Sequence, residues 1–188
     1  MGTRHVTAVY LDGEYKVAQY GQWDGYPEGQ GITALNFCWG LTDKDVLDQF
    51  KKNVKSCSWI TPEEEKEINE KIRNKELDDF YDTYPELNRD TGAGILYLIL
   101  MRGGLKLYDE IDFVADGLFC EWVWLIDLDK GTFEGYEGFQ KSPPKEGDRW
   151  YFLLDKCGEE YYTPKKVCEY SLDALPTDEE FLNGFHVE

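Results

Sequence analysis

The chain of 188 residues is 41% hydrophobic and 15% aromatic, so it carries enough apolar mass for a folded core and is not intrinsically disordered. Acidic residues outnumber basic ones by 38 to 20, and the formal charge of −18 disfavours direct binding to nucleic acid or to an anionic membrane surface. We expect a single domain over residues 1–188, with a surface that favours basic partners.

The five cysteines lie at least eleven residues apart and form no CxxC pair, which disfavours a disulfide framework and a zinc site. Free thiols fit a reducing compartment, so we expect a cytoplasmic protein. The first residues show no signal-peptide pattern, and the longest apolar run, at 95–101, is too short to cross a membrane.

The first predicted element is a β-hairpin with strands at 5–11 and 14–20. These strands flank Asp12-Gly13, a dipeptide typical of two-residue type I′ turns. A regular ladder from this turn places His5 opposite Tyr20. Because both faces of the hairpin are partly apolar, we expect it to lie inside a layered sheet.

The segment Lys16–Gly31, KVAQYGQWDGYPEGQG, is too polar and too rich in glycine for a core strand. Glycines let the backbone approach a ligand closely, rings offer stacking faces, and amides orient polar groups. We therefore expect a ligand-recognition site lined by Arg4, His5, Gln19, Tyr20, Gln22, Trp23, Asp24 and Tyr26. An ordinary turn and sheet corner is the alternative for the segment, and a half-buried structural histidine is the alternative for His5.

Helical patterns fill the middle of the chain. A helix is expected over 31–39, and a second begins after Thr42. The run Thr61-Pro62-Glu63-Glu64 combines an N-cap, a proline at the first helical position and a capping-box acid for a third helix. The apolar residues expected to bury one face of this helix are Ile68, Ile72, Leu77, Phe80, Tyr81 and Tyr84. A cap at Asp90 or Thr91 predicts a fourth, almost wholly apolar helix in the interior.

The C-terminal part reads as β-structure. The predicted strands span 118–127, 132–139, 149–155 and 161–170. The first two form a hairpin with Gly131 at the left-handed position of its turn. Thr177 opens a short terminal helix that ends at Gly184.

Catalytic and metal motifs are weak. Asp90-Thr91-Gly92-Ala93 matches the aspartic-protease tetrapeptide, but the hydrophobic strand that precedes that motif is missing, so we interpret the run as helix capping. His5 and His186 are the only histidines, which argues against an imidazole metal site and a Ser-His-Asp relay. We expect no metal and no cofactor, and the motifs alone identify no catalytic residue.

Two segments resemble N-terminal-nucleophile hydrolases. The opening 3–25 resembles the first hairpin of the proteasome-type members, and 121–134, EWVWLIDLDKGTFE, is similar to a hairpin of the acyl-transferase and bile-salt-hydrolase members. The resemblance implies an α+β fold, a layered αββα-like sandwich of antiparallel sheets with helices. It also implies a nucleophile at the mature N-terminus, a position that Thr3 takes only after proteolytic processing. An amidohydrolase that acts through Thr3 is thus one functional alternative.

A second resemblance covers most of the chain. KVAQYGQWDGYPEGQG, together with RDTGAGIL at 89–96 and CEWVWLIDLDKG at 120–131, resembles a family of uncharacterised proteins from bacteriophages, bacteria and filamentous fungi. A phage setting implies a counter-defence role in the host cytoplasm. We therefore expect a non-enzymatic binding protein that recognises a small polar ligand of nucleotide type or a basic protein. An acidic mimic of DNA is a further alternative.

Overall fold

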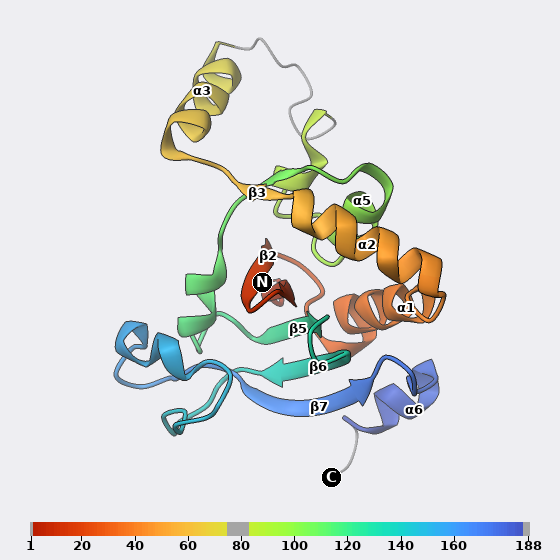
Figure 1. Ribbon diagram of the computed structural model, residues 1–188. Coiled ribbons are helices and arrows are strands. Elements are labelled where there is room, and N and C mark those ends of the chain that lie inside the picture. Colours follow the sequence, from red (N-terminus) through yellow and green to blue (C-terminus); the bar gives the residue numbers. More distant parts are fainter. Residues whose placement is uncertain (1, 75–82, 186–188) are drawn as a thin grey trace.

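A computed structural model of the protein describes residues 2–74 and 83–185. At its centre lies a five-stranded sheet with the strand order β2-β1-β5-β6-β7 (Figure 1). Its strands are β1 (His5–Leu11), β2 (Glu14–Gly21), β5 (Trp122–Asp127), β6 (Thr132–Glu137) and β7 (Lys165–Ser171). A two-stranded sheet pairs β3 (Ser58–Trp59) with β4 (Lys106–Leu107). The prediction of an α+β protein is confirmed.

The large sheet is mixed, whereas the sequence predicted antiparallel sheets stacked in a sandwich. Strands β1 and β5 pair in parallel, and the other three pairs are antiparallel. Parallel neighbours require a long crossover, and the helical middle of the chain supplies it between the two hairpins. The two hairpins therefore join edge to edge in one sheet.

The first hairpin has the predicted turn but a different register. Asp12 and Gly13 have φ values of 55° and 81°, as a type I′ turn requires. The pairing shifts by one residue shortly after the turn, so that Lys16 forms a β-bulge. As a result His5 lies opposite Gly21, and the predicted pairing of His5 with Tyr20 is wrong.

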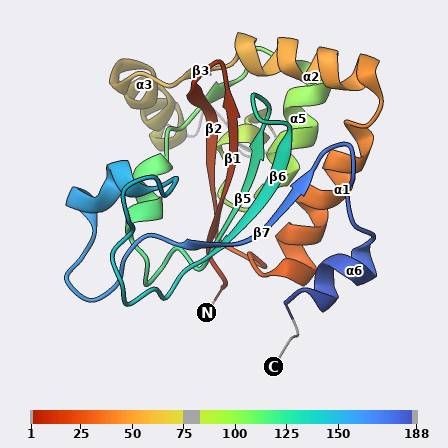
Figure 2. The same ribbon diagram turned by 60° about the horizontal axis from the view of Figure 1, so that its bottom comes forward.

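Four helices cover one face of the sheet (Figure 2). They are α1 (Ile32–Gly40), α2 (Lys44–Ser56), α5 (Gly94–Arg102) and α6 (Asp178–Asn183). Phe50, Ile95 and Phe181 from these helices pack with Trp124 and Phe133 of the sheet in one buried cluster. This cluster is the larger part of the core.

Short 3-10 helices cover the opposite face (Figure 2). They are η3 (Ile111–Ala115) and η4 (Tyr151–Lys156). The sequence predicted a strand over 149–155, and this prediction is wrong. Trp150 and Leu153 are both buried against the sheet, and side chains three residues apart share one side of a 3-10 turn.

The predicted caps are confirmed at two helices, where Thr61 and Thr177 form capping boxes at α3 (Pro62–Arg73) and α6. Helix α2 is capped by Asp43, one residue after Thr42, where the sequence placed the start. At α5 neither Asp90 nor Thr91 acts as the cap. A short π-helix, η1 (Pro27–Gly31), leads into α1, and a 3-10 turn, η2 (Pro85–Leu87), lies before α5.

Helix α3 lies away from the large sheet (Figure 1). None of its described residues is buried, and Ile72 is 42% exposed, so the prediction of a buried stripe is wrong for this helix. The predicted stripe residues Leu77, Phe80 and Tyr81 lie outside the described residues. Among the described parts of the chain, no helix is long and apolar enough to cross a membrane.

Candidate functional site

The eight residues predicted to line a recognition site differ widely in exposure. Trp23, Asp24 and Tyr26 are exposed, Arg4, Tyr20 and Gln22 are half-buried, and His5 and Gln19 are buried. Tyr26 lines one of the two cavities described below, of about 500 Å³, and the other seven residues line neither. The predicted site residues therefore do not converge on one of these cavities.

Several of these side chains bond to other parts of the chain. The Trp23 indole nitrogen donates to the Asp90 carboxylate at 2.9 Å, and the Tyr20 hydroxyl donates to Gln22 Oε1 at 2.7 Å. The Gln19 amide donates to the Asn88 carbonyl at 3.3 Å. The bonds of Trp23 and Gln19 join this part of the chain to the loop before α5. They pair part of the polar surface of this corner, while Gln19 Oε1 and both ring nitrogens of His5 are buried without a partner among the described residues.

His5 is fully buried, more deeply than the half-buried position that the sequence suggested. Burial lowers its pKa to about 3, so the imidazole is neutral at physiological pH. A methyl group at Gly21 would lie 2.0 Å from the His5 ring, which shows how closely the ring packs against the opposite strand. The structural interpretation of His5 is the one that these contacts support.

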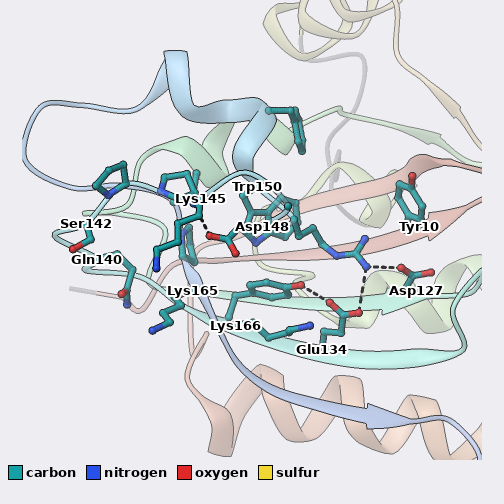
Figure 3. Close-up of a pocket in the computed structure, with 18 of the residues that line it drawn as sticks. Tyr10, Asp127, Glu134, Gln140, Ser142, Lys145, Asp148, Trp150, Lys165 and Lys166 are labelled. Atoms are coloured by element: carbon teal, nitrogen blue, oxygen red, sulfur yellow. Dashed lines mark hydrogen bonds and ion pairs between the residues drawn. The ribbon is translucent and has the colours of Figure 1, made fainter.

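A larger cavity of about 930 Å³ lies on the η3 and η4 side of the sheet (Figure 3). We call it the Arg149 cavity. Four parts of the chain build its wall: the first hairpin, strands β5 and β6, the loop and helix at 140–152, and the segment that enters β7. None of the predicted site residues lines this cavity.

A charged network forms one side of this cavity (Figure 3). Arg149 donates through Nη2 to Glu134 Oε1 at 3.2 Å and also to Asp127. Tyr136 donates its hydroxyl to the other oxygen of Glu134. Glu134 is fully buried and Asp127 is 4% exposed, so Arg149 is the nearest counter-charge of both carboxylates, and Lys130 lies 3.7 Å from Glu134 as a second cation.

The network changes the proton affinity of its members. Burial raises the pKa of Tyr136, and its hydrogen bond to Glu134 raises it further. Burial opposes the charge on Arg149, but the bond to Asp127 and the charge of Glu134 outweigh that effect and raise its pKa. Burial also raises the pKa of Tyr15 to about 12. Arg149 therefore stays cationic and both tyrosines stay protonated at neutral pH.

The charge of the Arg149 cavity is opposite to that of the whole chain. Its basic lining residues are Lys130, Lys145, Arg149, Lys165 and Lys166, and its acidic ones are Asp127, Glu134 and Asp148. Basic groups thus exceed acidic ones here, although the chain has 38 acidic and 20 basic residues. The smaller cavity, in contrast, has two glutamates and no basic residue among its lining residues.

The four lysines of the cavity differ in their partners. Lys130 contacts Glu169 at 2.7 Å, and Lys166 pairs with the same carboxylate. These two hydrogen bonds lower the pKa of Glu169 to about 2. Lys145 and Lys165 take part in no ion pair with a described residue, and both are exposed. Their ammonium groups remain open to an external anion.

Two buried polar atoms in the cavity wall also lack a partner among the described residues. They are the indole Nε1 of Trp150, which is 1% exposed, and the hydroxyl of Thr163, which is 3% exposed. An unpaired buried donor costs about 1–3 kcal/mol. A bound group that accepts from Trp150 would remove that cost, which favours a polar ligand in the Arg149 cavity.

Within residues 2–74 and 83–185, no three His, Cys, Asp or Glu side chains gather as a metal site would require. The described cysteines are free thiols, and burial raises the pKa of Cys38, Cys120 and Cys168, so these three are poor nucleophiles. Thr3 is half-buried, and its carbonyl accepts from the Gly25 amide at 2.9 Å.

Comparison with family models, with curated proteins and with solved structures finds no match to this chain.

Proposed function

We propose that this chain is a binding protein for a small anionic ligand, which it holds in the Arg149 cavity. The observation that carries the proposal is the local excess of basic groups inside a chain of net charge −18. The acidic remainder of the surface repels anions, so it disfavours binding elsewhere. Lys145 and Lys165, which have no described ion-pair partner, would hold the anion.

The walls of the cavity suit a small molecule better than a macromolecule. Its volume of about 930 Å³ lies near the upper end of the range of about 300–1,000 Å³ usual for ligand pockets. Rings, lysines and hydroxyl groups converge on it from separate parts of the chain. This combination can orient a polar ligand without any nucleophile or metal, which supports binding without catalysis.

A titration calorimetry experiment with ribose 5-phosphate tests the proposal. The double variant Lys145→Gln/Lys165→Gln should weaken binding at least tenfold, because it removes both unpaired cations. The matched control is Lys52→Gln/Lys71→Gln, which removes two exposed lysines of α2 and α3 that have no described ion pair and do not line the cavity. Equal weakening in both variants, or no binding to the unaltered protein, would contradict the proposal.

A basic protein partner is a second candidate, which the geometry of α3 favours. This helix buries none of its described residues and carries Glu63, Glu65 and Glu67 on its surface. A Lys-rich peptide should bind at low salt and lose affinity in the variant Glu63→Gln/Glu65→Gln/Glu67→Gln. A peptide affinity that this variant leaves unchanged would remove the candidate. The same experiment addresses the DNA-mimic hypothesis, which needs such a partner.

The amidohydrolase alternative, with its sandwich architecture of the N-terminal-nucleophile type, depends on a free amine at Thr3. Intact mass of the protein from its native host tests it. A mature chain that begins at Thr3 would support this alternative, and a chain that retains Gly2 would remove it.

A further inference from the structure

Aromatic rings line the Arg149 cavity beside its cations. The rings belong to Tyr10, Tyr15, Tyr136, Trp150 and Phe152. Tyr15 stacks on Trp150 with centroids 5.5 Å apart and an interplanar angle of 21°, and Phe152 lies 5.9 Å from Tyr15. Phe152 keeps 56% of its surface exposed, so this aromatic group can accept a further planar ring.

The unpaired charges limit how much negative charge the ligand carries. Arg149 already forms ion pairs with Asp127 and Glu134, and both Lys130 and Lys166 form ion pairs with Glu169. Two ammonium groups, those of Lys145 and Lys165, remain. The carboxylate of Asp148 also lines the cavity without an ion-pair partner among the described residues, and it accepts from the Lys145 amide at 2.7 Å. It offsets part of the charge of the two lysines, so the cavity favours an anion of low charge, such as a phosphate monoester with about −1.5 to −2 at pH 7. A polyphosphate would bring more charge than the unpaired lysines can neutralise.

The positions of these groups fit a ligand with two different ends (Figure 3). Lys145 and Lys165 lie on one side of the cavity, Tyr10 lies on the opposite side, and Trp150 lies between them. The indole N–H of Trp150 and the hydroxyl of Thr163 are the unpartnered polar groups of the wall. They match the hydrogen-bonding edge of a heterocycle or of a sugar.

We infer that the Arg149 cavity binds a nucleoside monophosphate. The phosphate lies between Lys145 and Lys165, and the base stacks on the ring of Phe152 and the neighbouring Tyr15. Inorganic phosphate would leave most of the 930 Å³ unfilled, and a nucleoside without phosphate would leave both lysines unmatched. This inference rests on the proposed function and names the ligand class for the same site.

Calorimetric titration of the full chain with a series of ligands tests the inference. The series contains the 5′-monophosphates of adenosine, guanosine, cytidine and uridine, together with ribose 5-phosphate and adenosine. At least one nucleotide should bind about 5- to 150-fold more tightly than ribose 5-phosphate, which is the gain expected from stacking one base. Adenosine alone should bind more weakly than its monophosphate.

The variant Phe152→Ala should remove the advantage of the nucleotide over ribose 5-phosphate. Its matched control is Tyr151→Ala, because Tyr151 is an exposed ring on the same η4 turn that does not line the cavity. Thermal unfolding of both variants shows whether they fold. If no nucleotide binds better than ribose 5-phosphate, the inference is overturned while the proposed function stands. If no phosphate compound binds, both are overturned.

Discussion

Arg149 places its Nη2 atom 3.2 Å from Glu134, a carboxylate that is fully buried in the sheet. The two residues come from different elements, since Glu134 lies on β6 and Arg149 precedes η4. Their ion pair joins the strands to the segment that closes the Arg149 cavity. The position of the cavity wall therefore depends on a buried charge pair.

Removal of Arg149 should destabilise the fold. Arg149→Met leaves Glu134 with only the more distant Lys130, at 3.7 Å, as a counter-charge, and loss of one partner of a buried pair costs about 3–5 kcal/mol. The double variant Arg149→Met/Glu134→Gln should recover part of this loss, because the amide carries no charge. Urea unfolding at pH 7 measures both values. Strictly additive losses would show that the two side chains are not coupled.

His5 should remain neutral well below the pH at which histidines usually titrate. Its pKa in the fold is about 3 against an ordinary value of 6.5, so below pH 6.5 protons bind the unfolded chain in preference. The stability that the buried neutral ring contributes is complete above pH 6.5 and falls by roughly 1.4 kcal/mol per pH unit towards pH 3.

Proton NMR of the ring signals measures this pKa directly. The chain has two histidines, and His186→Gln leaves His5 as the single signal. We expect a shift that stays constant from pH 8 to pH 4.5. A titration midpoint near 6.5 would mean that the ring is open to solvent.

Gly31 should tolerate no side chain. A methyl group there would lie 2.7 Å from Cζ2 of Trp124, whose indole nitrogen is fixed by a 2.8 Å bond to the Gly25 carbonyl. Gly31→Ala should therefore cost about 1–3 kcal/mol in urea unfolding. Gly40→Ala is the control, because nothing lies within 4 Å of a methyl group at that position. This variant should raise the free energy of unfolding by about 0.4–1 kcal/mol. Similar effects at both positions would contradict the packing described here.

Trp23 should be dispensable for binding in the Arg149 cavity. It is 47% exposed, and its indole bonds to Asp90 away from the lining residues. Trp23→Ala should leave the affinity for ribose 5-phosphate within a factor of two while it lowers thermal stability slightly. A tenfold loss of affinity would indicate that the ligand binds at the Lys16–Gly31 segment and not in the Arg149 cavity.

Local sequence signals predicted the elements that depend on neighbouring residues. The Asp12-Gly13 turn, the Thr61 and Thr177 capping boxes and the Gly131 turn position all rest on contacts within a few residues, and all four are confirmed. The predictions were wrong where contacts between distant segments determine the structure. The bulge at Lys16, for example, leaves no mark in the sequence.

The residues of the Arg149 cavity also come together only through the fold, because its cations are spread from Lys130 to Lys166 in the sequence. Two local signals are present: Arg149 directly precedes Trp150, and Lys165-Lys166 is a basic doublet within an acidic chain. The composition of the Lys16–Gly31 segment predicts a ligand site. In the fold, side chains of this segment bond to other parts of the chain, as in the 2.8 Å bond from the Ala93 amide to Gln30 Oε1.

The indole region of a ¹H–¹⁵N NMR spectrum tests the central claim most directly, because the chain has six tryptophans and each contributes one side-chain signal. On titration with adenosine 5′-monophosphate, the signal of Trp150 should move, since its N–H lies in the wall of the Arg149 cavity and lacks a described partner. The signals of Trp23 and Trp39 should stay in place. Movement of Trp23 with no change at Trp150, or no movement of any indole signal, would contradict the account.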